Sequence, residues 1–218
     1  MNCNANKEAI PLMVMGASIS LNNIDSVSVI PDRIEAGTFL IAVAATGGEV
    51  KLNNVNPIHS ETVISHLKKA NINLTVHDNS IVVSSDGKDI NACNMETNEY
   101  PGFPTDLQAQ IMVLMCRAIG NSKIQENIFE NRFMHVPELN RMGAKIKIKG
   151  NQAIIQGKKK LNGAELMATD LRASVSLVLA ALSSKSKTTI NRVYHLDRGY
   201  ENIEKKLSNC GAQIKRIK

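Results

Sequence analysis

The stretch DLRASVSLVLAALSSKSKT, residues 170–188, decides the fold because its pattern occurs three times in the chain. The segment DRIEAGTFLIAVAATGGEV begins at Asp32 and DLQAQIMVLMCRAIGNSKI begins at Asp106, and the three segments align without a gap when set on the aspartate. Each has an Asp, then a periodic apolar stretch, then small or polar residues. Because an Asp carboxylate accepts hydrogen bonds from the free N–H groups of a first helical turn, we predict that each Asp caps a helix.

These three predicted helices are rich in Ala, Ser, Val and Leu and carry few charges. A helix that is apolar on every side is buried in a core. We therefore predict three interior helices ringed by sheet.

A second pattern follows each of these helices, at 56–85, 133–157 and 194–218. Its spacing is typical of a short amphipathic helix, a turn and an alternating strand. The turns contain residue types that accept the left-handed backbone conformation at a helix end: Asn71, Gly143 and Gly211. In the second copy the alternation continues on both sides of Gly150, which predicts a hairpin of strands 145–149 and 151–156.

Three interleaved copies of one unit indicate one domain rather than three. We predict an α/β (α+β) domain over 27–218. Its predicted repeats span about 27–86, 87–158 and 159–218. Residues 1–26 read as a divergent segment in which 15–19 echo 142–146, and we interpret them as the remnant of a preceding unit.

Composition limits the classes of partner. The 218 residues include 26 Lys and Arg against 20 Asp and Glu, and the net charge of +6 favours anionic partners. Aromatic residues make up only 3% of the chain, which argues against the stacking platforms that bind RNA. No apolar run approaches the roughly 18 residues of a membrane span, and no signal-like segment begins the chain. We expect a cytoplasmic protein with no nucleic-acid and no membrane partner.

The cysteines and histidines lack the spacing of metal ligands. Cys3, Cys93, Cys116 and Cys210 form no C-x-x-C pair, which fits a reducing compartment, and the five histidines contain no H-E-x-x-H. No glycine-rich phosphate loop occurs either. We expect no metal and no cofactor.

The loop YPGFPTD, residues 100–106, contains two prolines and a glycine directly before the second Asp helix. A loop this stiff aims Asp106 in one direction. Two interpretations remain open: Asp106 is a general base, or it only caps its helix.

The segment ENIFENRFMHVPEL, residues 126–139, places polar groups at high density beside Phe129 and Phe133. It is either the wall of a ligand site or a loop that satisfies its own backbone.

Two arginines, Arg172 and Arg198, stand in surroundings with few charges. The guanidinium fork matches phosphate and carboxylate groups, so both are candidates for binding an anion. The alternative is an internal ion pair, of Arg172 with Asp170 or of Arg198 with Glu201.

Five motifs together resemble the UDP-N-acetylglucosamine 1-carboxyvinyltransferase family. They are PDRIEAGTFLIA (31–42), YPGFPTDLQAQ (100–110), IFENRFMHVPELNRMGA (128–144), MATDLRASVSLVLA (167–180) and YHLDRGYENIEKKL (194–207). The resemblance implies an inside-out α/β barrel of the enolpyruvyl transferase type, built from three βαβαββ-like repeats with buried helices. It also implies transfer of the enolpyruvyl group of phosphoenolpyruvate to the 3-hydroxyl of UDP-N-acetylglucosamine, the first committed step of peptidoglycan synthesis.

The resemblance assigns roles to individual residues. It implies catalytic roles for Asp106, as the base, and for Asp170 and Arg198. It implies that the substrates are bound by Thr105, Asp106, Ile128, Phe129, Arg132, Arg172 and Arg198.

The resemblance covers only the carboxyl-terminal domain of that family. The family's amino-terminal domain, which supplies a Lys-Asn pair for phosphoenolpyruvate and a loop with a general-acid cysteine, has no counterpart here, and no cysteine of this chain stands in a matching context. We therefore expect the chain to be inactive alone. The alternative is a non-catalytic half that binds a UDP-sugar, or a split-enzyme subunit that needs a separate amino-terminal partner. A link to RNA 3′-phosphate cyclases, which share related repeats, is disfavoured by the five motifs.

Overall fold

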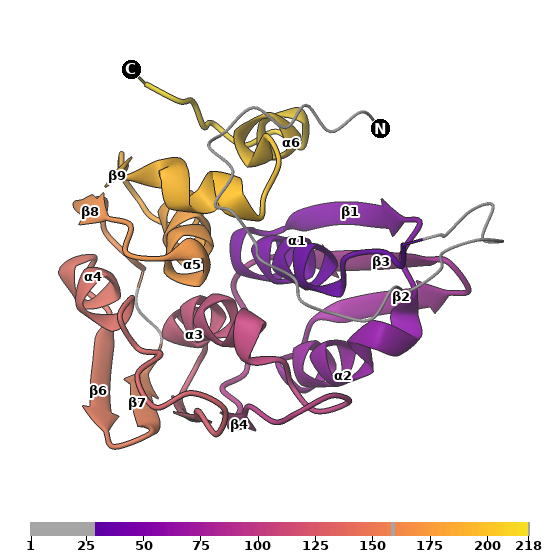
Figure 1. Cartoon of the computed structure of the whole chain (residues 1–218), viewed down its shortest axis with the longest axis horizontal. Helices are drawn as coiled ribbons and strands as arrows, with labels where there is room; N and C mark the ends of the chain where they lie inside the picture. Colours follow the sequence, from indigo (N-terminus) through magenta and orange to yellow (C-terminus); the bar gives the residue numbers. More distant parts are fainter. Residues whose placement is uncertain (1–28, 158–159, 218) are drawn as a thin grey trace, which may run out of the picture. The chain divides into compact units, whose positions relative to one another are not determined.

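The computed structural model describes residues 29–157 and 160–217, and its contacts group residues 31–218 into one compact unit, separate from residues 1–30. This unit holds every helix and strand of the described residues (Figure 1). The expected divergent segment 1–26, with its echo at 15–19, lies outside the described residues.

Three buried helices form the centre of this unit. They are α1 (Arg33–Thr46), α3 (Gln108–Arg117) and α5 (Leu171–Leu182). Each contacts the other two, and Figure 1 shows them in the middle of the unit. Their side chains are buried on nearly every side. The prediction of three interior helices is confirmed. The burial follows from their composition, because an apolar helix surface is stable only when it is removed from water.

The strands within the first predicted repeat, 27–86, form an antiparallel sheet of order β1-β3-β2, with each register position paired. Its elements are β1 (Gly48–Asn53), the 3₁₀ turn η1 (Pro57–Ser60), α2 (Glu61–Lys69), β2 (Asn73–His77) and β3 (Ser80–Ser85).

The second repeat forms a sheet of order β4-β5-β7-β6, in which β4 runs parallel to β5. Its elements are β4 (Met95–Glu96), η2 (Thr105–Leu107), β5 (Asn121–Gln125), α4 (Val136–Arg141), β6 (Lys145–Lys149) and β7 (Gln152–Gln156). The predicted hairpin around Gly150 is confirmed, since β6 and β7 pair antiparallel from Lys145 opposite Gln156.

The third repeat has a shorter sheet, the parallel pair of β8 and β9. Its elements are β8 (Glu165–Met167), β9 (Thr189–Asn191), η3 (Val193–Arg198) and α6 (Ile203–Asn209). The alternating strand expected after Gly211 is wrong, because 212–217 has no strand assignment. Alternation alone does not make a strand: a strand needs a neighbour to bond, and no described strand pairs with this segment.

The helix starts confirm two of the three predicted Asp caps. Asp32 accepts hydrogen bonds from the amides of Ile34 and Glu35 at 2.7 and 3.1 Å. Asp170 accepts from the amides of Arg172 and Ala173 at 2.8 and 2.9 Å.

The third cap is wrong, because Asp106 lies inside the 3₁₀ turn η2 and α3 begins only at Gln108. The Asp106 carboxylate bonds two arginine side chains instead of the helix amides. Two charge-assisted hydrogen bonds to guanidinium groups thus satisfy this carboxylate in place of the helix amides.

The predicted turns are confirmed, since Asn71, Gly143 and Gly211 all have positive φ. One further glycine has a packing role: a Cβ on Gly37 would collide with the side chain of Leu107, so glycine lets α1 approach the turn that carries Asp106.

Candidate active site

Asp106 lies between two guanidinium groups from different repeats. Its Oδ1 accepts a hydrogen bond from Nη2 of Arg132 at 2.9 Å, and its Oδ2 accepts one from Nη2 of Arg172 at 2.8 Å. The Asp106 side chain is 33% exposed, so the cluster is open to a ligand in solution. The alternative pair of Arg172 with Asp170 is wrong: Asp170 bonds the backbone amide of Arg172, and the guanidinium reaches Asp106.

Thr105 and Phe129 complete this cluster. The Thr105 hydroxyl accepts a hydrogen bond from Nη1 of Arg132 at 3.0 Å. The Arg132 guanidinium lies over the Phe129 ring, with its carbon 4.6 Å from the ring centroid, which is a cation–π contact. Arg132 therefore joins the stiff loop before α3 to the segment after β5.

One buried carboxylate holds this segment in place, and the sequence reasoning missed it. Glu126 is 2% exposed, and its Oε2 accepts a hydrogen bond from the Thr105 hydroxyl at 2.9 Å. Its Oε1 accepts from the amides of Ile128 and Phe129 at 2.9 and 3.2 Å. Strand alternation offered a signal, because Glu126, directly after β5, continues the alternating burial of Ser122 and Ile124.

The sequence also did not predict a hydrogen-bond network of buried polar side chains next to Asp106. Nε2 of Gln110 donates to the backbone oxygen of Asp106 at 3.0 Å, and the hydroxyls of Thr38 and Tyr200 lie 2.9 Å apart. Nε2 of Gln110 also lies 3.3 Å from the Thr38 hydroxyl. Burial raises the pKa of Tyr200, while its hydrogen bond with Thr38 and the nearby charge of Arg172 act in the opposite direction. Side chains from all three repeats therefore meet below the carboxylate.

His135 is buried beside the same cluster. Its Nε2 lies 3.2 Å from the sulfur of Met112, and burial lowers its pKa to about 4. The charge of Asp170 raises this pKa and that of Arg132 lowers it, so both charges are felt at the ring. The imidazole of His135 is therefore neutral near pH 7 and adds no positive charge to the site.

Two predicted site residues stand apart from the cluster. Asp170 caps α5 and so fixes the first turn, which carries Arg172. Arg198 is the last residue of η3, and its side chain is exposed. Within residues 29–157 and 160–217 it takes part in no ion pair, so the predicted alternative pair with Glu201 does not form there. The structure thus brings Thr105, Asp106, Phe129, Arg132 and Arg172 together, with Ile128 adjacent, and leaves Arg198 unpaired in this part of the chain.

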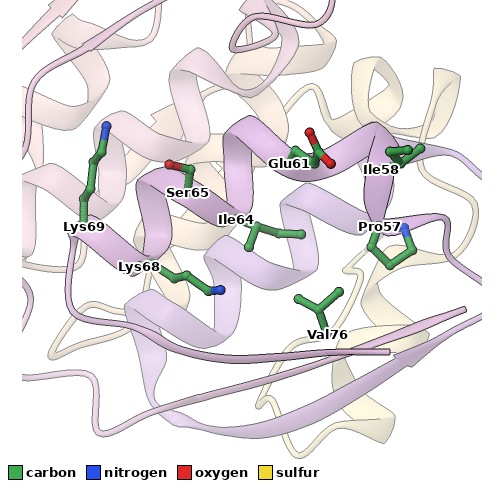
Figure 2. Close-up of a pocket in the computed structure, with 8 residues that line it drawn as sticks. All are labelled: Pro57, Ile58, Glu61, Ile64, Ser65, Lys68, Lys69 and Val76. Carbon is green, nitrogen blue, oxygen red and sulfur yellow. The ribbon is translucent and has the colours of Figure 1, made fainter. Parts of the chain in front are cut away.

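A separate pocket lies on the first repeat, between η1, α2 and β2, as Figure 2 shows. Pro57, Ile58, Ile64 and Val76 supply apolar surface, and Lys68 lies beside them. None of the residues around Asp106 lines it, so it is not the candidate site.

The described part of the chain contains no group of three or more His, Cys, Asp and Glu side chains placed to hold a metal ion. None of its helices combines the length and the apolar character needed to cross a membrane.

Comparison with known proteins defines the class. Residues 7–207 match the family model described as EPSP synthase (3-phosphoshikimate 1-carboxyvinyltransferase). The chain belongs to this EPSP synthase family of carboxyvinyltransferases.

Relatives in this family are more specific. The chain is 57% identical to the UDP-N-acetylglucosamine 1-carboxyvinyltransferase of Pelagibacter ubique, with 100% of this chain and 52% of the relative covered. It is 54% identical to the protein of that name from Rickettsia bellii, with 99% and 53% covered. The chain therefore spans about half the length of the relatives that it matches.

Solved structures agree on the fold. The enolpyruvyl transferase NikO from Streptomyces tendae superposes with a TM-score of 0.78 at 26% identity, over 87% of this chain and 45% of that one. EPSP synthase from Acinetobacter baumannii superposes with a TM-score of 0.66 at 18% identity, over 85% and 46%. The predicted architecture, an inside-out α/β barrel with buried helices, is confirmed.

Proposed function

We propose that this chain carries the acceptor-activating half of an enolpyruvyl transferase acting on UDP-N-acetylglucosamine and phosphoenolpyruvate. The observation that carries this proposal is the cluster in which Arg132 and Arg172 hold the Asp106 carboxylate from both sides. The identity of 57% to a relative of that activity supports the choice of acceptor.

The proposed reaction is an addition followed by an elimination. The 3-hydroxyl oxygen of the sugar bonds the enol carbon of phosphoenolpyruvate, a proton adds to the methylene carbon, and the hydroxyl proton goes to a base. Loss of a proton from the methyl carbon then restores the double bond as inorganic phosphate leaves. The products are the enolpyruvyl ether and phosphate, with no oxidant or reductant consumed.

Asp106 is the proposed base. A carboxylate has about four lone-pair sites, and the two guanidinium groups occupy two of them, so two remain for the hydroxyl proton. Because both arginines fix its orientation, Asp106 meets the acceptor in one geometry, which lowers the entropy to be lost in the transition state.

Most of the other predicted residues are proposed to serve one of the two substrates. Arg172 and Arg198 are proposed to bind phosphoenolpyruvate, whose phosphate and carboxylate suit guanidinium forks. Thr105, Ile128 and Phe129 are proposed to contact the nucleotide sugar. Asp170, as the cap of α5, is proposed to hold Arg172 in place.

The proton donor to the methylene carbon is proposed to lie in the half of the relatives that this chain does not match. We propose that the complete activity needs that half, with its cysteine loop, and that the chain alone turns over no substrate. The proposed compartment is the cytoplasm, in keeping with free Cys93 and Cys116.

A reconstitution experiment tests the function. This chain is combined with the half of the Pelagibacter ubique relative that it does not match, and phosphate release is measured with both substrates present. The positive control is the same relative split into its own two halves. We expect phosphate release that requires both halves and UDP-N-acetylglucosamine. No release in the hybrid, with full release in the control, would contradict the proposal, and release with 3-phosphoshikimate instead would assign a different acceptor.

A further inference from the structure

The Glu126 carboxylate is more deeply buried than any residue of the cluster that it supports. It lies directly after β5 and is 2% exposed. Burying a charge costs free energy unless hydrogen bonds compensate it, so its partners indicate what the charge is for.

Four donors face this one carboxylate. Three of them bond Oε1: the Thr97 hydroxyl at 2.8 Å, the Ile128 amide at 2.9 Å and the Phe129 amide at 3.2 Å. The Thr105 hydroxyl bonds Oε2 at 2.9 Å. An ionised carboxylate has about four acceptor sites and no donor, so it suits a place where four donors converge.

The Thr105 bond sets the direction of the next contact. A hydroxyl has one hydrogen, and Thr105 gives it to Glu126. Its lone pairs are therefore left to accept from Nη1 of Arg132 at 3.0 Å. Nη2 of the same guanidinium bonds Asp106 at 2.9 Å, so the orientation fixed at Glu126 reaches the proposed base through two side chains.

The two amide bonds set the other side of the site. They hold the backbone of 128–129 in a turn around the carboxylate, and so present Ile128 and Phe129 outward, with exposed fractions of 37% and 52%. Exposed apolar side chains on a backbone held this firmly are suited to contact a ligand.

We propose that Glu126 is a positioning residue for the nucleotide sugar, which it does not touch. It fixes the Ile128–Phe129 backbone and the hydrogen-bond direction from Thr105 through Arg132. This inference rests on the proposed function, because it assumes that the segment contacts UDP-N-acetylglucosamine. A merely structural role would lower stability and leave the choice between the two substrates unchanged.

The test uses the reconstituted enzyme, with Glu126→Gln in this chain. The glutamine side chain has the same length as glutamate, but one acceptor oxygen becomes an NH₂ group. This NH₂ group cannot accept a hydrogen bond from the hydroxyls and amides that bond Glu126. Dissociation constants for UDP-N-acetylglucosamine and for phosphoenolpyruvate are measured by NMR titration, and thermal stability is measured alongside. The matched control is Glu130→Gln, which removes the same charge from an exposed position of the same segment.

We expect the Kd for UDP-N-acetylglucosamine to rise at least tenfold in Glu126→Gln, about 1.4 kcal/mol, with the Kd for phosphoenolpyruvate within twofold. Glu130→Gln should leave both unchanged. Amide hydrogen exchange at Ile128 and Phe129 should become faster in the free Glu126→Gln protein. If Glu126→Gln fails to fold, Glu126→Asp, which keeps the charge but withdraws it by one methylene, should show the same selective loss.

Three results overturn the inference. An unchanged sugar Kd in a folded variant, or an equal rise for both substrates, would mark Glu126 as structural only. A reconstituted wild-type enzyme that binds no UDP-N-acetylglucosamine would remove the proposed function, and the positioning role with it.

Discussion

Arg172 donates a hydrogen bond from Nη2 to Oδ2 of Asp106 at 2.8 Å, although 66 residues separate the two in the chain. The arginine lies in the first turn of α5 and the aspartate in the turn before α3, so the contact joins two repeats. It ties a residue proposed to bind phosphoenolpyruvate to the residue proposed to activate the acceptor. Substitutions at Arg172 and Arg198 should therefore have different effects.

Arginine-to-lysine substitutions separate the two roles. In the reconstituted enzyme, Arg198→Lys should raise the KM for phosphoenolpyruvate at least tenfold, because lysine keeps the charge but loses the fork. The KM for UDP-N-acetylglucosamine should stay nearly unchanged. Arg172→Lys should impair phosphoenolpyruvate use and also lower kcat, because it releases one side of Asp106. Steady-state kinetics with each substrate varied in turn checks this.

Two results of these kinetic measurements would assign other roles to the arginines. Equal weakening of both substrates by Arg198→Lys, with a lower melting temperature, would make Arg198 a structural residue. A double variant no worse than either single variant would show that the two arginines act as one unit.

His135 should make stability depend on pH. Burial lowers the pKa of His135 from 6.5 to about 4. Between pH 4 and pH 6.5, the histidine is therefore protonated in the unfolded chain and neutral in the folded protein. Stability is therefore fully present above about pH 6.5 and is lost as the pH falls towards 4, by roughly 3 kcal/mol in all. Urea unfolding at a series of pH values measures this loss.

Two variants identify the histidine responsible. His135→Gln should flatten the pH dependence of the free energy of unfolding over that range, whereas His77→Gln, at an exposed position of β2, should keep the wild-type slope. An unchanged slope in His135→Gln would assign the effect to other groups.

The cysteines should differ in reactivity. Cys116 lies in α3, where burial raises its pKa to about 12, and alkylation requires the thiolate. Cys210 is exposed at the end of α6. Iodoacetamide near neutral pH should modify Cys210 and leave Cys116 intact until urea unfolds the protein, as peptide mass spectrometry can measure. Modification of Cys116 in the folded protein would show that α3 opens to solvent.

The sequence predicted the elements whose pattern is local. The caps at Asp32 and Asp170 and the hairpin around Gly150 depend on neighbours a few residues away. The predicted cap at Asp106 was wrong, because its carboxylate bonds two arginines that are distant in the sequence. The strand after Gly211 failed because pairing depends on a partner, which alternation does not reveal.

The site follows the same division. The resemblance identified Thr105, Asp106, Arg132 and Arg172, which the structure brings together. It did not identify Glu126 or the contact of Thr38 with Tyr200, 162 residues apart, because those hydrogen bonds exist only after the repeats pack. Buried polar residues that position a site, such as Glu126 and Thr38, have no sequence motif by which they could be predicted.

Asp106 is proposed to receive the proton of the acceptor hydroxyl. Asp106→Asn keeps the shape of the side chain and removes its charge, and because the carboxylate is about one third exposed, its loss should destabilise the fold by only about 1 to 2 kcal/mol.

The decisive measurement is the rate of phosphate release by the reconstituted enzyme with Asp106→Asn, at saturating concentrations of both substrates and with the melting temperature recorded. We predict a folded enzyme whose kcat falls by at least about a hundredfold, as expected for the loss of a general base. A folded variant with kcat within about tenfold of wild type would contradict the role of Asp106 as the base, because Asp106 would then only anchor Arg132 and Arg172.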